Sequence, residues 1–114
     1  MSEKVIVRFC PSPTGYIHIG SVRTGLYVWL MARQSGGKYI LRVEDTDKKR
    51  EVENGVKIIT DTMAAFGLEA DEFALQSERK ELHREYAQKL YEKGLAYADN
   101  VSPEEVEAWR QDAQ

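Results

Sequence analysis

Short apolar runs alternate along the chain with segments whose apolar residues recur at helical spacing. Residues 5–9 read Val-Ile-Val-Arg-Phe, a β-branched run that is typical of a strand covered on both faces in a parallel sheet. From Gly20 onward the spacing predicts a helix, and two consecutive glycines at residues 36–37 mark its end. The apolar residues of this helix are Val22, Leu26, Trp29 and Leu30.

The same alternation occurs a second time. Residues 39–43 (Tyr-Ile-Leu-Arg-Val) predict a second strand, and a charged loop over residues 44–50 follows it. The next helix ends at Gly67 and has one apolar side, formed by Val56, Ile59, Met63 and Phe66. Because both crossovers are long enough to pass over a sheet, the pattern predicts an α/β fold with parallel strands.

A third, shorter repetition completes the predicted sheet. Residues 73–75 predict a short strand. The helix that follows ends at Gly94 and is marked by Leu82, Tyr86 and Leu90. We expect Tyr86 and Leu90 to lie in the core together with Trp29, because large apolar side chains at helical spacing usually face the interior.

The last segment carries the signals of a helix start. Ser102 suits the N-cap position, and Pro103 suits the first helical position. Glu105 can complete a capping box with Ser102. No stop signal follows before Gln114, so we expect the chain to be truncated within this helix.

Composition limits what a chain of 114 residues can do. With 42% apolar residues it can build one modest core, so a single domain is the ceiling. Charged residues of both signs make up 31% of the chain, and a net charge of −3 excludes a strongly basic nucleic-acid-binding surface over the whole chain. Cys10 is the only cysteine, which excludes an internal disulfide and a cysteine cluster for zinc and favours a reducing compartment. No apolar run is long enough to cross a membrane.

The start of the first predicted helix is the first candidate for chemistry. In an open parallel sheet, ligands bind beyond the carboxyl ends of the strands, and His18 and Gly20 follow the first strand there. Unpaired N–H groups, close backbone approach at Gly20 and a hydrogen bond from the His18 imidazole all favour phosphate binding. The Gly-x-Gly-x-x-Gly and Gly-Lys-Ser/Thr patterns are both missing, which removes the main support for a hydride-transfer or P-loop function.

Four motifs occur along the chain in a characteristic order. They are residues 8–15 (Arg-Phe-Cys-Pro-Ser-Pro-Thr-Gly), 18–21 (His-Ile-Gly-Ser), 42–47 (Arg-Val-Glu-Asp-Thr-Asp) and 76–79 (Gln-Ser-Glu-Arg). The second motif resembles the His-Ile-Gly-His signature with which class I aminoacyl-tRNA synthetases bind ATP. The complete set resembles the glutamyl-tRNA synthetase family, and the resemblance covers nearly all of the chain.

This resemblance implies a fold and an activity. The fold is the first half of a class I synthetase Rossmann-like domain, a three-stranded parallel sheet with helices over residues 1–94. Residues 95–114 would begin an acceptor-stem-binding insertion with one strand and part of a helix. The activity is that of a cytoplasmic ligase in which ATP with Mg²⁺ activates L-glutamate before the acyl group passes to tRNA. The catalytic task is then mainly positioning and charge stabilisation.

The resemblance also assigns roles to single residues. The ATP-binding positions are Thr14, His18, Gly20 and Ser21, of which the last three are catalytic. The glutamate-binding positions are Arg8, Cys10, Ser12 and Glu44. Arg8 would meet the side-chain carboxylate and Glu44 the α-ammonium group of the substrate. Asp47 and Arg50 would contact the tRNA 3′ end, and no residue is assigned to a metal. We expect Arg8 and His18 to face one shared cleft.

Each assignment has a structural alternative. His18 could simply cap a turn. Arg8 is a charge in an otherwise apolar strand, where it needs a partner, and it could form an ion pair with Glu44 or Asp45. Asp45 and Asp47 could cap the second helix or lie solvated in the charged loop.

The sequence departs from the family in ways that affect function. It has no counterpart of the second class I signature, a Lys-Met-Ser-Lys-Ser-like loop, so the isolated chain is not expected to complete tRNA charging, and tRNA would be bound through the full-length parent. Residues 98–100 (Ala-Asp-Asn) stand where many bacterial members begin a zinc site, so no zinc is expected. The family's strand order would leave the first strand at an open edge, which invites self-association.

Two other functions stay open at this point. One is a glutamyl-queuosine tRNA synthetase-like enzyme, which attaches glutamate to a modified tRNA nucleoside, although Thr46 favours the tRNA-charging branch. The other is a non-catalytic module that binds a nucleotide or a protein partner.

Overall fold

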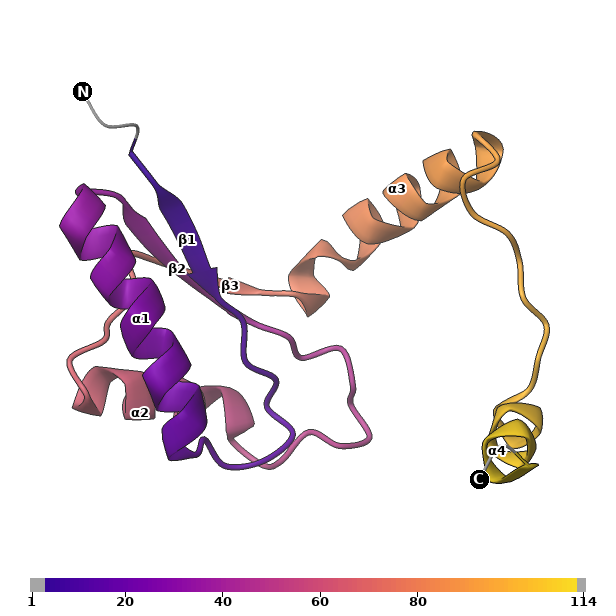
Figure 1. Ribbon diagram of the computed structural model, residues 1–114, viewed down its shortest axis with the longest axis horizontal. Coiled ribbons are helices and arrows are strands. Elements are labelled where there is room, and N and C mark those ends of the chain that lie inside the picture. Colours follow the sequence, from indigo (N-terminus) through magenta and orange to yellow (C-terminus); the bar gives the residue numbers. More distant parts are fainter. Residues whose placement is uncertain (1–3, 113–114) are drawn as a thin grey trace. The chain divides into compact units, whose positions relative to one another are not determined.

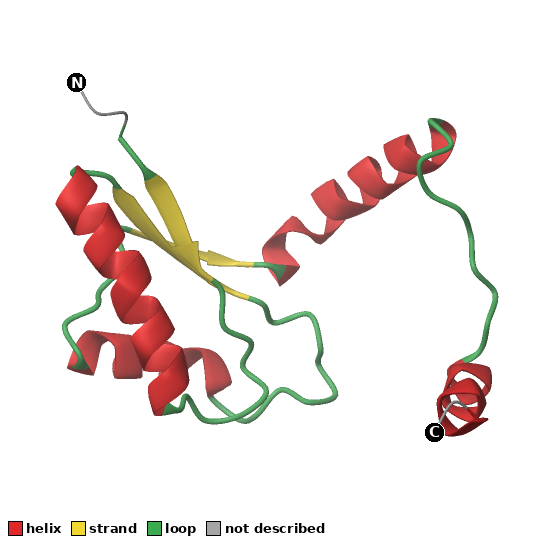
Figure 2. Cartoon of the chain, viewed as in Figure 1, coloured by secondary structure: helices red, strands yellow, loops and turns green. Residues whose placement is uncertain are grey.

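The computed structural model describes residues 4–112, which belong to two compact units. The first unit ends at Lys80, and the second begins at Glu81. In chain order the elements are β1 (Ile6–Phe9), α1 (Ile19–Ser35), β2 (Lys38–Val43), α2 (Gly55–Ala65), β3 (Glu72–Leu75), the 3-10 turn η1 (Ser77–Arg79), α3 (Lys80–Glu92) and α4 (Pro103–Asp112) (Figures 1 and 2). The predicted alternation of strands and helices is confirmed.

The three strands form one parallel sheet with the order β1-β2-β3 (Figure 1). The register places Arg8 beside Ile40 and Phe9 beside Leu41. On the other side of β2, Phe73 lies beside Leu41. Within the sheet that the described residues form, β1 is therefore an edge strand, as the family's strand order predicted.

The core lies on one face of this sheet, between the strands and the two helices α1 and α2. Its buried residues are Phe9, Val22, Ala32, Tyr39, Leu41, Val43, Ile59, Met63 and Leu68. Side chains alternate between the two faces of a strand, so the residues beside this series face the other way. Ile6 is 68% exposed and Arg8 is exposed, so the prediction that the first strand is covered on both faces is wrong for the described residues. Both crossovers return over the same face, which leaves the second face of this unit open.

The predicted helix ends are confirmed. Gly36 has a φ of 60° and caps α1, and its N–H group donates to the carbonyl of Arg33. Gly67 and Gly94, which follow α2 and α3, also have positive φ values of 70° and 69°. A left-handed residue directly after a helix is a common way to end it, and glycine adopts that conformation without a steric penalty.

The second unit corrects one prediction about α3. Tyr86 and Leu90 share one side of the helix, but they are 58% and 46% exposed. Within the second unit the prediction that they belong to a core is therefore wrong, because the described residues of that unit, 81–112, bury neither side chain. Trp29 of α1, in contrast, is partly buried against the core.

The last described segment matches the sequence prediction only in part. Ser102 and Glu105 form the predicted capping box: the Ser102 N–H donates to Glu105 Oε2 (2.8 Å), and the Glu105 N–H donates to Ser102 Oγ (3.2 Å). The hydrogen bond from the Ser102 N–H lowers the pKa of Glu105. The strand expected after Leu95 does not form, because residues 95–102 are loop and have no neighbouring strand to pair with in the described chain.

Among residues 4–112, no helix combines the length and the apolar composition that a bilayer span requires.

Candidate functional site

Backbone hydrogen bonds gather three loops at the carboxyl end of the sheet. The Glu44 N–H donates to the carbonyl of Pro11 (2.9 Å), which joins the loops after β2 and β1. The Gln76 N–H donates to the carbonyl of Val43 (3.0 Å), which joins the end of β3 to the end of β2. The motifs that begin at these three strand ends therefore lie together, in the place where ligands bind open parallel sheets.

His18 caps the N-terminus of α1. Its Nδ1 atom accepts a hydrogen bond from the Gly20 N–H (3.1 Å), and its Nε2 atom lies 3.3 Å from Ser21 Oγ. The structural alternative for His18 is thus present in the structure. Because Nδ1 accepts, a neutral ring carries its proton on Nε2, on the side of Ser21. A Cβ atom on Gly20 would lie 2.9 Å from the imidazole ring, so glycine at this position allows the ring to fold back over the helix start.

A cavity of about 220 Å³ lies at this helix start. Of the residues assigned to ATP, Thr14, His18 and Ser21 line it, and so does Ser12 from the glutamate-binding group. Gly20 and Cys10 do not line it. We call it the His18 cavity. Cavities that hold a complete drug-sized ligand usually measure roughly 300–1,000 Å³, so this one suits the phosphate part of a nucleotide better than the whole molecule.

A second cavity of about 190 Å³ lies beside the open face of the sheet. Three arginines line it, Arg8, Arg42 and Arg79, and Glu72 is the only acidic residue in its lining. We call it the arginine cavity. Its excess of fork-shaped cations suits a carboxylate.

The partners of these charges differ from those considered in the sequence. Arg8 is exposed and has no hydrogen bond or ion pair among residues 4–112, so it does not carry the desolvation cost expected of a buried charge. Glu44 instead forms its ion pair with Arg42, two residues earlier. The Nε atom of Arg42 is buried without a partner in the described part of the chain, so this guanidinium still has an unused donor.

Arg8 and His18 line separate cavities, so the described residues do not form the single cleft expected from the sequence. Phe9 shows the reason. Phe9 lines the His18 cavity while its neighbour Arg8 lines the arginine cavity, because successive residues of a strand point to opposite faces. Arg8 and Glu44 are assigned to the same substrate, and Glu44 contacts the Arg42 side chain that lines the arginine cavity with Arg8.

Asp47 and Arg50, the two residues assigned to the tRNA end, are paired with each other. Arg50 Nε donates to Asp47 Oδ2 (2.6 Å), and the Arg50 N–H donates to Asp47 Oδ1 (3.3 Å). The hydrogen bond from the Arg50 side chain holds the pKa of Asp47 below its usual range. The side chain of Arg50 is 74% exposed, so it is accessible to a partner that competes for its charge.

The bonding of Asp45 to Ser77 was not predicted from the sequence. This carboxylate is buried, and both of its oxygen atoms accept hydrogen bonds from Ser77, which lies 32 residues further along the chain. The sequence feature that could have indicated this contact is the presence in one chain of the motif at residues 42–47, which contains Asp45, and the Gln-Ser-Glu-Arg motif at residues 76–79.

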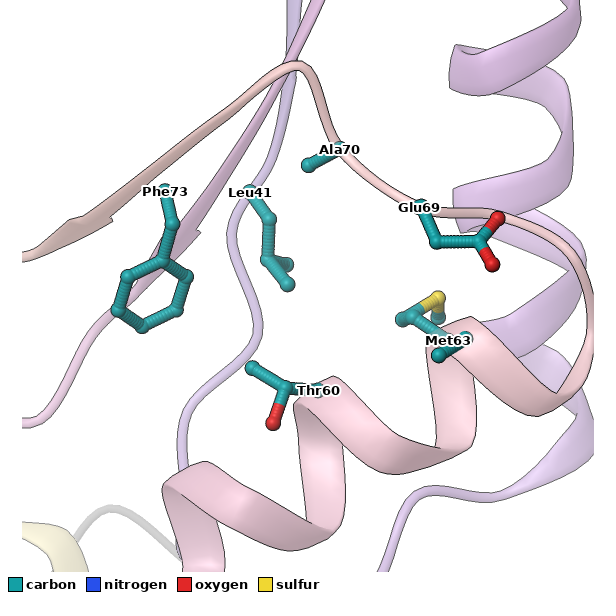
Figure 3. A pocket seen from close by; sticks show the side chains of 7 residues that line it. Leu41, Thr60, Met63, Glu69, Ala70 and Phe73 are labelled. Atoms are coloured by element: carbon teal, nitrogen blue, oxygen red, sulfur yellow. The ribbon is translucent and has the colours of Figure 1, made fainter.

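An apolar cavity of about 210 Å³ lies elsewhere, between the sheet and α2. Figure 3 shows Leu41 and Phe73 from the strands above Thr60 and Met63 from the helix. No residue assigned to ATP, glutamate or tRNA lines this cavity. Residues 4–112 also contain no group of three or more His, Cys, Asp or Glu side chains placed to hold a metal ion.

An open parallel sheet with a cavity at the start of the first helix is the arrangement of a Rossmann-like fold. The sequence from residue 4 to residue 114 matches the family described as class I tRNA synthetases (E and Q), catalytic domain. The chain belongs to this family, and the resemblance and fold class predicted from the motifs are confirmed.

Two named relatives are similar to this chain over nearly its whole length. Glutamate–tRNA ligase 1 of Alkalilimnicola ehrlichii is 47% identical over 110 residues, which is 96% of this chain and 23% of that protein. Glutamate–tRNA ligase 2 of Brucella ovis is 49% identical over 114 residues, which is 99% of this chain and 24% of the relative.

Two solved structures are similar as well. The crystal structure of a glutamate tRNA ligase from Elizabethkingia meningosepticum in complex with its amino acid has a TM-score of 0.87 and 39% identity, and the match covers 96% of this chain and 24% of that one. Glutamate-tRNA synthetase from Elizabethkingia anophelis has a TM-score of 0.88 and 39% identity with the same coverage. The chain therefore spans about a quarter of the length of these relatives.

Proposed function

We propose that this chain is the part of a glutamate–tRNA ligase that binds ATP and glutamate and brings them together for adenylate formation. One observation supports this most: Thr14, His18 and Ser21, three of the four residues assigned to ATP, line the phosphate-sized cavity at the start of α1. The names of the relatives point to the same reaction.

In this proposal the start of α1 holds the triphosphate. The residues that bind ATP are Thr14, His18, Gly20 and Ser21, and the last three act in catalysis. The helix N-terminus attracts the phosphates, and His18 Nε2–H donates to a phosphate oxygen as charge develops there. When present, Mg²⁺ neutralises part of the triphosphate charge.

The glutamate substrate is held from the arginine cavity. Arg8 binds its side-chain carboxylate, and Glu44 binds its α-ammonium group, with Cys10 and Ser12 on the connecting loop. One oxygen of the α-carboxylate attacks the α-phosphorus of ATP, which forms the C–O–P link of glutamyl-adenylate. Pyrophosphate leaves with the electron pair of the broken P–O bond. The protein contributes orientation and charge stabilisation.

The proposal extends to tRNA and to the domain division. Asp47 and Arg50 would open their mutual ion pair to contact the 3′ end, and residues 95–114 would begin the acceptor-stem-binding insertion. The proposal also places the protein in the cytoplasm, because tRNA charging takes place there. The exposed Cys10 is a free thiol, which suits a reducing compartment.

The open edge of β1 is expected to cause self-association. This strand presents unpaired backbone groups on one side, and Ile6 is 68% exposed. The average mass from light scattering should therefore rise with protein concentration. A lysine at an edge strand blocks pairing, so Ile6→Lys should reduce the rise, whereas Ile19→Lys on α1 should not. A wild-type chain that stays monomeric at every concentration would remove this part of the proposal.

The role of His18 can be separated from helix capping. Asparagine is among the best N-caps but has no imidazole, whereas alanine removes the cap at a cost of about 1 kcal/mol. If the ring donates to phosphate, His18→Asn and His18→Ala should both bind ATP roughly 10- to 100-fold more weakly, the worth of one charge-assisted hydrogen bond. Calorimetric titration with ATP measures this.

The same pair of variants can contradict the assignment. Wild-type ATP affinity in His18→Asn, with a loss only in His18→Ala, would show that His18 serves as a cap alone. Ser35→Ala is a suitable control, because Ser35 is at the other end of α1 and bonds only to its own helix.

A further inference from the structure

Asp45 is a buried charged residue to which the proposed reaction assigns no role. Asp45 is 4% exposed, and its carboxylate accepts three hydrogen bonds. Ser77 supplies two of them, from its N–H to Oδ1 (2.9 Å) and from its hydroxyl to Oδ2 (2.6 Å). Lys48 Nζ supplies the third, to Oδ2 at 3.3 Å. Burial alone would raise the pKa of Asp45, but the bonds from Ser77 and Lys48 outweigh it and the pKa is lowered.

The Asp45 carboxylate lies next to a residue that is assigned to the substrate. It follows Glu44 directly, at the end of the central strand β2. Glu44 is tied to the first loop through its N–H bond to Pro11, and Gln76 is tied to β2 through its N–H bond to Val43. The bonds from Ser77 to Asp45 therefore add a second tie between the ends of β2 and β3, so that the residues on both sides of Glu44 are bonded to the segment after β3 while Glu44 itself is bonded to the loop after β1.

We infer that Asp45 is a positioning residue that holds Glu44 in place for the substrate's α-ammonium group by bonding to Ser77, a contact we call the Asp45–Ser77 clamp. This inference rests on the proposed role of Glu44. It gives the Gln-Ser-Glu-Arg motif a function, because Ser77 supplies both donors. A long-range pair of this kind fixes the loop after β2 better than local turn bonds do, since the loop is otherwise held at Asp45 only by the exposed Lys48.

The clamp predicts a selective effect of substitutions. Asp45→Ala removes all three bonds. Asp45→Asn keeps an oxygen for the Ser77 N–H and offers an N–H to the Ser77 hydroxyl, so it preserves the geometry without the charge. Ser77→Ala removes one bond and keeps the buried carboxylate, which provides a milder variant if Asp45→Ala does not fold. Lys48→Ala is the matched control, because it removes only the longest and most exposed of the three contacts.

The first measurement needs no ligand. Amide hydrogen exchange of Glu44 and Gln76 reports on the two backbone bonds beside the clamp. Exchange at both should be about tenfold faster in Asp45→Ala and Ser77→Ala, and close to wild type in Asp45→Asn and Lys48→Ala. Amides in the middle of α1 should not change in any variant. Unchanged exchange at Glu44 in both Asp45→Ala and Ser77→Ala would overturn the inference.

The second measurement compares two ligands, ATP and glutamyl-sulfamoyl adenosine, a stable mimic of glutamyl-adenylate. The ratio of their affinities isolates the amino-acid part, which a merely structural role would leave unchanged. Asp45→Ala should bind the mimic at least tenfold more weakly than wild type and should bind ATP with wild-type affinity. Asp45→Asn should bind the mimic with an affinity close to that of wild type. Equal losses for both ligands, or a loss in Asp45→Asn as large as in Asp45→Ala, would overturn the clamp. If the wild-type chain binds neither ligand, the proposed function fails and hydrogen exchange alone decides the clamp.

Discussion

Alanine in place of Gly37 is expected to destabilise the first unit by about 4 kcal/mol or more, the largest stability effect of any single substitution considered for this chain. A Cβ atom at residue 37 would lie 2.0 Å from the carbonyl oxygen of Val5, far inside any permitted contact. That same carbonyl accepts the hydrogen bond from the Lys38 N–H (2.9 Å), which begins the pairing of β1 with β2. Relief of the clash therefore separates the two strands at their first residues.

Urea denaturation followed by circular dichroism measures this change, and Gly15→Ala is the matched control. A Cβ atom at Gly15 would have no other heavy atom of the described residues within 4 Å apart from its chain neighbours, and Gly15 has no positive φ. The free energy of unfolding of its alanine variant should therefore stay within about 0.5 kcal/mol of wild type. Native domains are stable by only about 5–15 kcal/mol, so Gly37→Ala should leave much of the protein unfolded or shift its midpoint strongly. Equal midpoints for the two variants would show that β1 is not held at this point.

Local signals in the sequence predicted the parts of the fold that depend on neighbouring residues. The helix end at Gly36 and the capping box between Ser102 and Glu105 are formed within a few residues, so their chemistry is visible in a short stretch of sequence. The parallel sheet followed from the alternation of short apolar runs and helical periods.

Predictions failed where the outcome depends on what covers a surface. An apolar side on α3 indicates that something can pack there, but within the second unit the described residues do not bury Tyr86 and Leu90. The strand expected after Leu95 failed for a related reason, since a strand requires a neighbour to accept its hydrogen bonds. Periodicity identifies a face of an element and does not identify its partner.

The loops that carry the candidate site were predictable from the sequence, and the arrangement of their side chains was less so. The loops after β1 and β2 were placed together correctly by the rule for parallel sheets. The alternation of side chains along β1 could have shown that Arg8 and Phe9 face opposite ways, but the resemblance to a family favoured one cleft. The bonds between Asp45 and Ser77 span 32 residues, which no local pattern can reveal.

Arg8→Ala is expected to have the largest effect on ligand binding. It removes the proposed partner of the substrate's side-chain carboxylate, and a bidentate charged contact corresponds to roughly a 10- to 100-fold loss of affinity for glutamyl-sulfamoyl adenosine. Arg8→Lys keeps the charge but loses the fork, so it should fall between alanine and wild type. ATP affinity should not change, because Arg8 does not line the His18 cavity. Arg23→Ala is the control, since Arg23 stacks on Tyr27 of its own helix (5.2 Å) away from both cavities.

The separation of the two cavities also determines how Arg8 and His18 combine. Arg8 and His18 line different cavities and would contact different parts of the mimic, and such residues usually contribute additively to binding within about 0.3–0.5 kcal/mol, so in Arg8→Ala/His18→Asn the two fold-losses for the mimic should multiply. Calorimetric titration of the single and double variants completes the cycle. A double variant that binds the mimic no worse than Arg8→Ala alone would mean that the two side chains do not act independently, which would contradict their assignment to separate cavities. A loss of ATP affinity in Arg8→Ala would contradict the assignment of Arg8 to the amino acid, because the substrate carboxylate is absent from that titration.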